Sequence, residues 1–238
     1  MLKGTRLTIE DNCSTCRSSL IRHEMQQAGL MANNAYIHGT SSTEQERLTI
    51  LNRLTNRSFI DFLALADARS ILEIGSGLGI LTEQVADLVP DREVWGIEYS
   101  PEQLAAARAR RRPNLHFIQG DAHRLPFKDE RFDVVYCRYV LEHVANPLHV
   151  LREMHRVLKP EGKVFIEENN ILVLVLYPDC PHFDAVWRQF ARLQEQLGGD
   201  ALIGKKLLPL LKTAGFQRIA LSVAPEICLL YTSPSPRD

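Results

Sequence analysis

The sequence predicts a doubly wound α/β domain with a mostly parallel sheet. Short apolar runs alternate with amphipathic stretches from about residue 70 onward, and a glycine-rich turn at residues 75–79 directly follows the first of these runs. Strands that alternate with helices form parallel sheets with helices on both faces. A chain of 238 residues, 45% of them hydrophobic, is long enough to bury the core of such a domain.

Five strands follow from the apolar runs and their borders. The first run ends at Gly75, and the helix after it stops at Pro90. Ser100 supplies an N-cap for the next helix, with Pro101 at its first position and Gln103 as capping-box partner. The expected strands are 71–74, 93–98, 115–119, 132–137 and 163–167; the expected helices include 81–89 and 147–158, and residues 159–162 form a turn before the fifth strand.

Two helical segments lie outside this alternation. Residues 43–55 begin with a capping box from Thr43 to Glu46 and place leucines at a spacing of three, at positions 48, 51 and 54. Residues 183–197 form a helical insertion after the fifth strand, with an apolar stripe of Phe183, Val186, Trp187, Phe190 and Leu193. Either helix is a lid over a pocket or packs on the core, and the sequence leaves both interpretations open.

Composition argues against several classes of partner. The formal net charge is -1, so no nucleic-acid partner is expected, and the local run of Arg108, Arg110, Arg111 and Arg112 is interpreted as a solvated helix end. Cys13 and Cys16 form a single C-x-x-C without a second pair, so no metal site is predicted. The longest apolar stretch, residues 171–177, is too short to span a membrane, and the start does not resemble a secretory signal. These features predict a cytoplasmic protein.

The two ends are expected to lie outside the folded domain. Residues 1–30 lack a sustained apolar period, so we expect a disordered or non-native extension, with Met31 as an alternative start. Residues 228–238 read CLLYTSPSPRD, which resembles a translated sequencing-library adapter; a Ser/Pro-rich tail is the alternative. The expected domain therefore spans residues 31–227, and the natural chain is expected to be truncated near Ile227.

The glycine turn is the motif that indicates ligand chemistry. Gly75, Gly77 and Gly79 let the backbone turn sharply and approach a ligand, and the free amides at the helix start favour negative groups. Glu98 ends the second strand about twenty residues later, where a carboxylate can accept both hydroxyls of a ribose. A dinucleotide fingerprint requires Gly or Ala at position 80, where this chain has Ile80, so a nicotinamide oxidoreductase is disfavoured.

In this pattern the chain resembles the class I S-adenosylmethionine-dependent methyltransferases, of the methyltransferase type 11 or UbiE-like kind. The resemblance covers roughly residues 36–225 and implies a Rossmann-like fold. It departs from the family at Glu161, where Gly is common after Lys159-Pro160. The motifs that carry it, in order, are LEIGSGLG from Leu72, GIEYS from Gly96, GDA from Gly120 with LPF from Leu125, FDVV from Phe132, LEHV from Leu141, LREM from Leu151 and VLKP from Val157.

The resemblance implies S-adenosyl-L-methionine as cofactor and assigns roles by position. The methionine part would be held by the turn of Gly75, Gly77 and Gly79, with Glu73 orienting its amino group. Glu98 would accept from the ribose hydroxyls, and Tyr99 would lie against the adenine. Further cofactor contacts would come from Asp121 and Ala122 at the adenine, from Cys137 and Arg138 on the methionine side, and from Tyr36 and His38 in a segment that folds over the cofactor.

The expected reaction is in-line transfer of a methyl group to a small-molecule acceptor. The cofactor carries the reactive methyl group, so the protein needs a base only where the acceptor is a poor nucleophile. His143 and Glu167 are candidate bases, with Glu168 beside the latter, but the sequence assigns the role to none of them. A catalytically silent cofactor-binding or partner-binding homologue is the alternative.

The resemblance also implies an antiparallel hairpin at the end of the sheet. Residues 218–223 would supply one of its strands, and the other would lie beyond the present sequence. We therefore expect the fifth strand to have a poorly covered edge, which is a liability because unpaired strand edges favour aggregation.

Overall fold

The computed structural model describes residues 39–170 and 179–223. Several sequence-based expectations fall outside these ranges: the extension 1–30, the C-x-x-C, Tyr36 and His38, the apolar stretch 171–177, and the tail 228–238. No helix in the described ranges combines the length and the apolar character needed to cross a membrane.

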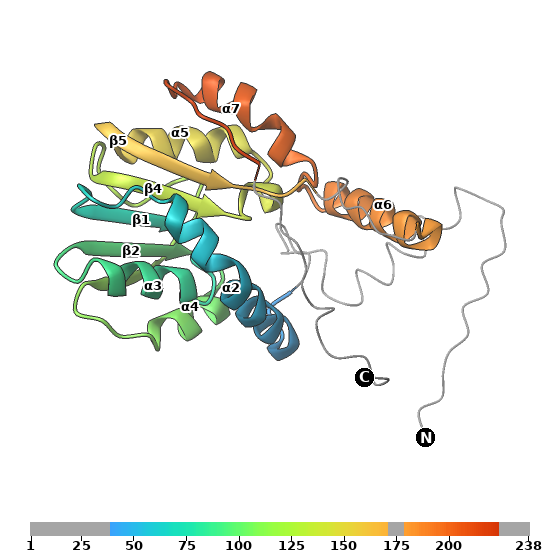
Figure 1. The fold of residues 1–238 in the computed structure, drawn as a ribbon, viewed down its shortest axis with the longest axis horizontal. Helices are drawn as coiled ribbons and strands as arrows, with labels where there is room; N and C mark the ends of the chain where they lie inside the picture. The colour runs from blue at the N-terminus through green and yellow to red at the C-terminus, as the bar shows by residue number, and fades with distance from the viewer. Residues whose placement is uncertain (1–38, 171–178, 224–238) are drawn as a thin grey trace, which may run out of the picture.

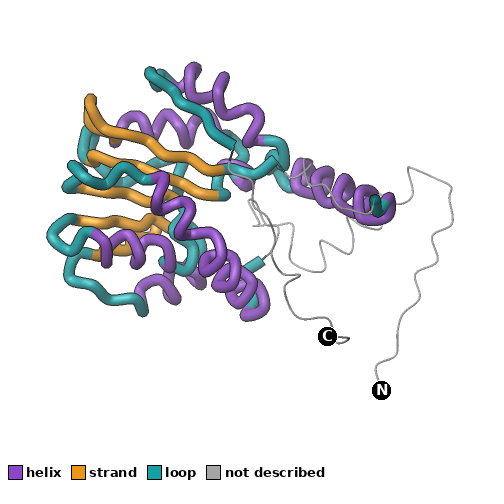
Figure 2. Tube along the Cα trace, viewed as in Figure 1, coloured by secondary structure: helices purple, strands orange, loops and turns teal. Residues whose placement is uncertain are grey.

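Five parallel strands form the sheet, in the order β3-β2-β1-β4-β5 (Figures 1 and 2). The central strand β1 pairs with β2 from Ser70 opposite Glu93 to Ile74 opposite Ile97, and with β4 on its other side. This confirms the predicted doubly wound parallel sheet. The strands are β1 (Ser70–Ile74), β2 (Glu93–Glu98), β3 (Leu115–Gln119), β4 (Phe132–Arg138) and β5 (Leu158–Glu167).

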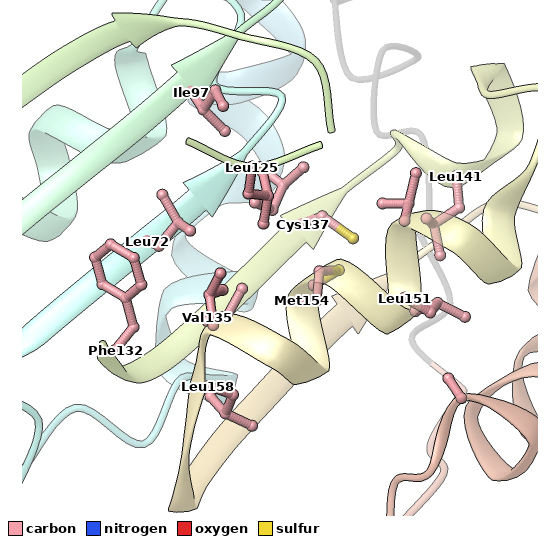
Figure 3. Packing of buried hydrophobic residues seen from close by; sticks show 14 of the residues in the cluster. Leu72, Ile97, Leu125, Phe132, Val135, Cys137, Leu141, Leu151, Met154 and Leu158 are labelled. Carbon is pink, nitrogen blue, oxygen red and sulfur yellow. The ribbon is translucent and has the colours of Figure 1, made fainter. Parts of the chain in front are cut away.

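Helices cover both faces of this sheet, each over its own apolar core. On one face α2 (Ser42–Phe62) and α3 (Ile80–Leu88) contribute Phe59 and Val85, which pack with Tyr136 of β4. On the other face lie α5 (Pro147–Val157) and α7 (Leu207–Ala214), and Figure 3 shows α5 side chains against the inward residues of β1 and β4. The predicted stripe of α5 is buried as expected: Val150, Leu151, Met154, Val157 and, at its end, Leu158.

Capping residues set the starts of two helices. Ser100 Oγ accepts from Gln103 N at 3.2 Å and precedes Pro101, the first residue of α4 (Pro101–Arg108). Asn146 Oδ1 accepts from His149 N at 3.0 Å at the start of α5, which also begins with proline. These bonds satisfy amides that have no partner inside the helix.

The first described helix, α2, differs from its predicted form. It starts at Ser42, and Ser41 Oγ, not Thr43, accepts from Glu44 N at 3.3 Å. The predicted capping box was therefore wrong, because Thr43 already lies within the helix. The helix also ends at Phe62 and not at the predicted residue 55. Phe59 and the following Leu63 are buried in the core, which explains the additional length of the helix.

The insertion after β5 contains α6 (Pro181–Gln196), which extends away from the carboxyl end of the sheet (Figure 1). Rings of its predicted stripe stack on one another: Phe183 with Trp187 at 5.6 Å and Trp187 with Phe190 at 5.4 Å between centroids. Only Ala191 and Gln194 of this helix are buried. Short helical turns η1 (Leu141–His143) and η3 (Ile203–Lys206) complete the described elements.

The edge at β5 departs from the prediction. Phe132 pairs with Leu158 and Val134 with Lys163, so residues 159–162 bulge out of a strand that starts directly at the end of α5. Residues 218–223 form no strand, so the expectation that they pair in the sheet was wrong. They still lie near this edge, because Ile219 packs against the core and Arg218 Nη2 lies 3.5 Å from Glu161. Among the described residues, β5 pairs only with β4.

Asp133 ties the start of β1 to the bulge in β5 and provides a test of the fold. Its carboxylate accepts from the amides of Arg69 and Ser70 at 3.0 and 2.9 Å and pairs with Lys159 Nζ at 2.7 Å. Partial burial raises the pKa of Asp133, but these hydrogen bonds outweigh it and lower the pKa from 3.8 to about 2. The ionised carboxylate therefore stabilises the fold above about pH 4, and this contribution disappears as the pH falls toward 2.

We expect Asp133→Asn to lower the free energy of unfolding at pH 7 by about 1–3 kcal/mol, because charge-assisted hydrogen bonds are lost. Urea denaturation measures this, and the difference from wild type should shrink as the pH is lowered from 4 toward 2. Asp67→Asn, at an exposed position, is the matched control. An effect equal to that of the control, or one independent of pH, would contradict the assigned role.

Candidate functional site

A cavity of about 320 Å³ lies at the carboxyl ends of β1, β2 and β4. This is the edge at which open parallel sheets bind ligands. The predicted site residues that line it are Glu73, Gly75, Gly77, Glu98, Tyr99, Asp121, Ala122, Arg138 and His143. The structure therefore brings together, in one cavity, predicted residues from five separate segments of the sequence.

The glycine turn after β1 forms the floor of the cavity. The amides of Gly75 and Ser76 both donate to Ile97 O, at 2.9 and 3.0 Å, which joins the turn to β2. Gly75 has φ 68°, and a Cβ there would lie 2.6 Å from Val140 Cγ2. Only glycine fits this position without displacing its neighbour.

Gly79, unlike Gly75 and Gly77, does not line the cavity. It is the N-cap of α3 with φ 70°, and a Cβ there would lie 2.6 Å from Phe117 Cζ. Its requirement for glycine therefore comes from the close packing of α3 on β3, and the expected ligand contact at this position is not supported.

Glu98 is the carboxylate that organises this part of the cavity. Its Oε2 accepts from Gly77 N at 2.7 Å and its Oε1 from Ser100 N at 2.8 Å, so the side chain is fixed between the two loops. Burial raises the pKa of Glu98 in spite of these amides. Each carboxylate oxygen has two acceptor sites, so both can still accept from a ligand. Tyr99 beside it is 60% exposed.

Asp121 lies across the cavity mouth in the turn after β3. It accepts from His123 N at 2.9 Å and contacts the His123 ring at 2.8 Å. Partial burial raises the pKa of Asp121, but these contacts lower it overall. The carboxylate is therefore ionised at neutral pH and half exposed, and Ala122 follows it in the lining.

Glu73 lies in the deepest part of the lining. The same carboxylate oxygen accepts from Thr82 Oγ1 at 2.6 Å and from Tyr136 OH at 3.0 Å. Burial raises the pKa of Glu73 to about 8, because removing a carboxylate from water disfavours its charge. The group is thus largely protonated at neutral pH in the absence of a cationic ligand.

Arg138 connects the end of β4 to α2. Its Nε donates to Glu167 Oε1 at 2.7 Å, its Nη1 to Asn56 Oδ1 at 2.8 Å, and its Nη2 to Thr55 Oγ1. Asn56 in turn donates to Gln84 Oε1 of α3 at 2.8 Å. Arg138 therefore lines the cavity and also fixes the position of the helix that forms its wall.

Besides Gly79, two further predicted residues are not placed in the lining. Cys137 is fully buried in the core against α5 (Figure 3), because alternate residues of a strand point to opposite faces and Cys137 points away from the cavity. Glu167 binds Arg138 and does not line the cavity. The expected ligand contact of Cys137 and the role of Glu167 as a base are not supported by this arrangement.

The turn η1 forms the far end of the cavity with Glu142 and His143. The side chain of Glu142 accepts from Asn169 Nδ2 at 3.2 Å and from Gln194 Nε2 at 3.3 Å. Glu168 lies behind it and accepts from the amides of Val140 and Leu141 at 2.9 and 2.7 Å. Burial raises the pKa of both carboxyls, that of Glu168 to about 8, with Glu142 adding repulsion.

Sequence reasoning missed several lining residues. Arg47, Leu48, Leu51 and Asn52 of α2 all line the cavity, while Leu54 is 60% exposed. The leucine spacing predicted the helix but left open whether it covered a pocket; the lining residues place its first half over the cavity. Glu142 was quoted only as part of a motif. Ser76 was also missed: its buried Oγ has no hydrogen-bond partner among the described residues.

Within residues 39–170 and 179–223, no group of three or more His, Cys, Asp or Glu side chains could hold a metal ion. The polar groups that line the cavity include carboxylates, hydroxyls, amides, two arginines and two histidines.

Comparison with known proteins finds similarity to one protein family. The family described as "Methyltransferase domain" matches residues 72–166, which run from β1 into β5. A methyltransferase candidate from Bacillus halodurans has a solved structure that is 26% identical, with a TM-score of 0.57, covering 68% of this chain and 69% of that one. The match supports the fold across both layers of helices.

Two relatives illustrate the range of similarity. A 37.1 kDa protein of transposon Tn4556 from Streptomyces fradiae is 32% identical over 204 residues, covering 82% of this chain and 57% of the relative. A demethylmenaquinone methyltransferase of Renibacterium salmoninarum is 36% identical over 116 residues, covering 49% and 48%. The chain thus spans about half the length of the curated relatives it matches.

The buried carboxyl of Glu73 gives a testable pH dependence. Between its ordinary pKa of 4.5 and the raised value of about 8, the unfolded chain releases a proton that the folded chain keeps. The carboxyl therefore lowers the stability of the fold as the pH rises through this window. Glu73→Gln keeps an oxygen that can accept from Thr82 and Tyr136 but cannot ionise.

We expect the free energy of unfolding of Glu73→Gln, relative to wild type, to increase by about 1 kcal/mol or more between pH 5 and pH 8. Chemical denaturation at both pH values measures it, with the exposed Glu46→Gln as control. If the difference between variant and wild type stays constant or falls with pH, Glu73 is not the protonated group described here.

Proposed function

We propose that the chain binds S-adenosyl-L-methionine in the cavity beside β1 and β2 and transfers the methyl group to a small-molecule acceptor. The match of residues 72–166 to the methyltransferase domain family supports this proposal. The sulfonium supplies an electrophilic methyl group when the cofactor is bound. The remaining work falls to the chain's own residues, which bind, orient and exclude water.

The position of Glu98 is the observation that supports this proposal most strongly. Gly77 N and Ser100 N hold its carboxylate at the end of β2, and each oxygen retains an acceptor site toward the cavity. A pair of vicinal ribose hydroxyls presents two donors to such a group. Asp121 and the Ala122 backbone lie next along the lining, where an exocyclic amine would find an acceptor.

The floor of the cavity fits the other end of the cofactor. Gly75 and Gly77 line this end of the cavity, and the Ser76 Oγ, which has no hydrogen-bond partner among the described residues, offers a hydrogen-bonding group for a carboxylate. Glu73 lies deeper in the same lining and would be ionised by an adjacent ammonium group, since an opposite charge lowers a raised carboxyl pKa. Arg138 completes this end.

The remaining lining supports a small acceptor with apolar surface. Leu48 and Leu51 of α2 line the cavity together with Val140 and Val144, and the cavity volume is about 320 Å³. Several relatives are demethylmenaquinone methyltransferases, so an aromatic ring of the hydroquinone type is the acceptor we propose to test. An in-line approach to the methyl group then requires α2 to hold the ring.

A proton acceptor is available at the η1 end if the acceptor needs one. His143 lines the cavity, and its Nε2 lies 3.6 Å from Glu142 Oε1. We propose His143, with Glu142 orienting it, in preference to Glu167, which Arg138 engages. A carboxylate beside an imidazole stabilises its protonated form.

We expect saturable binding of S-adenosyl-L-methionine by isothermal titration calorimetry and no binding of NADH. Glu98→Gln should weaken binding by about tenfold or more, because one oxygen that accepts from the ribose is lost and an amide donor replaces it. Glu93→Gln, at the exposed start of the same strand, should leave the affinity unchanged. Absence of binding by folded wild-type protein, or equal affinity of the Glu98 variant, would contradict the proposed cofactor site.

We expect release of S-adenosylhomocysteine when 1,4-naphthohydroquinone is supplied with the cofactor, detected by mass spectrometry together with the methylated product. His143→Asn should lower the rate while leaving cofactor affinity unchanged. Binding without turnover of this acceptor would exclude the hydroquinone proposal, and binding without turnover across an acceptor panel would indicate a catalytically silent homologue.

A further inference from the structure

A second groove, separate from the cavity, runs along the outer edge of β3. It has a volume of about 490 Å³ and shares no lining residue with the cavity. Four consecutive β3 residues, 115–118, line it. Since successive strand residues point to opposite faces, a groove that touches all four follows the edge of the strand and not one of its faces.

The edge at this groove has open hydrogen-bonding groups. Among the described residues β3 pairs only with β2. Asn114 O accepts from Val94 N at 2.9 Å, and Gly120 N donates to Glu98 O at 3.0 Å, so the even-numbered residues direct their backbone groups toward β2. By the alternation of a parallel ladder, Phe117 and Gln119 direct their amides and carbonyls outward, and Phe117 lines the groove. Leu115 directs its carbonyl outward too, but its amide already donates to Arg112 O at 3.2 Å.

Four arginines from the end of α4 and the following loop form the groove's other wall: Arg108, Arg110, Arg111 and Arg112. Arg110 pairs with Glu83, and Arg112 pairs with Asp87 and, at 3.1 Å, with Glu83, both acids of α3. The side chains of Arg108 and Arg111 also line the groove, and neither forms an ion pair with an acidic side chain in residues 39–170 and 179–223. Their two charges are therefore uncompensated beside the open edge.

The aromatic lining argues against a nucleobase as the occupant. Trp95 has the His116 ring at 4.5 Å and the Arg131 guanidinium at 4.5 Å from its centroid, and its edge meets Phe127. A base needs an unoccupied aromatic face on which to stack. The faces of Trp95 are already engaged, whereas the strand edge remains open.

We propose that this groove is a docking site for an extended acidic segment of a partner protein, which adds to β3 as a further strand. Backbone groups of the segment pair with the outward groups of β3, and its acidic side chains contact Arg108 and Arg111. Charged residues at an edge strand also discourage pairing with like chains. The same positive charge selects a segment of opposite charge, which gives strand addition its specificity.

The test uses a fluorescein-labelled peptide of four Glu-Val repeats and the full chain, with fluorescence anisotropy as readout. We expect saturable binding that weakens with salt, and no binding of the matching Lys-Val peptide. A Glu-Val peptide with N-methylated valines retains the charge but loses alternate amides, so its affinity should fall about tenfold or more. Hydrogen exchange should show the Phe117 amide protected on binding of the unmethylated peptide only.

Two double variants separate the groove from general charge. Arg108→Glu with Arg111→Glu should weaken the Glu-Val peptide by about tenfold or more. Arg53→Glu with Arg192→Glu makes the same change in net charge at exposed positions of α2 and α6 and should leave the affinity unchanged. Thermal melts establish that both variants are folded.

Four outcomes would overturn the proposal: no binding of the Glu-Val peptide, equal affinity of its N-methylated form, equal weakening by both double variants, or tighter binding of a dT10 oligonucleotide. None of these measurements involves the cofactor cavity, so their results test the docking proposal independently of the proposed methyl transfer.

Discussion

The carboxylate of Glu98 is the contact on which the geometry of the site depends. It receives one amide from the glycine turn after β1 and one from the loop after β2, and so fixes the separation of the two loops. The backbone hydrogen bonds from Gly75 and Ser76 to Ile97 O also hold the glycine turn against β2. A binding surface made of loops thereby acquires the rigidity of the sheet below it, and preorganised donors and acceptors need little rearrangement when a ligand arrives.

Several buried acidic side chains lie around this cavity. Burial raises the pKa of Glu73, Glu98, Glu142 and Glu168, and only Asp121, at the mouth, is lowered. Hydrogen bonds from hydroxyls and amides offset part of the desolvation at each carboxyl without reversing it. A cavity of this kind has a preference for ligands that bring positive charge or several donors, which agrees with a sulfonium cofactor that also carries an ammonium group and hydroxyls.

The strands and the glycine turn could be predicted because each has a strong local signal. Residues 93–98 and 115–119 are bounded by charge or turn residues on both sides, and their predicted limits agree with β2 and β3. The caps at Ser100 and Pro101 are equally local. Glu98 could be named in advance because it ends the second strand, whereas Glu73 was named because of the resemblance to a known family.

What the sequence left open depends on contacts between distant residues. Ser41 caps α2 in place of Thr43, two residues later. Both side chains carry a hydroxyl that can act as an N-cap, so the sequence alone does not decide between them. Residues 218–223 have a strand-like composition but form no ladder at β5. The link from Arg138 to Thr55 and Asn56 joins positions more than eighty residues apart, and nothing in the local pattern of α2 indicates it. Cys137 could be assigned to the core only once it was known which side chains of β4 point toward α5.

That link has a mechanical consequence for α2. The helix is held near its carboxyl end, where Thr55 and Asn56 contact Arg138 and Phe59 enters the core. Arg47, Leu48 and Leu51 line the cavity about one to two turns before Thr55. When a rigid helix is held near one end, a small change in its tilt moves the residues at the other end the most. The hydrogen bond from Arg138 to Glu167 therefore bears on the position of the leucines, although Glu167 itself does not line the cavity.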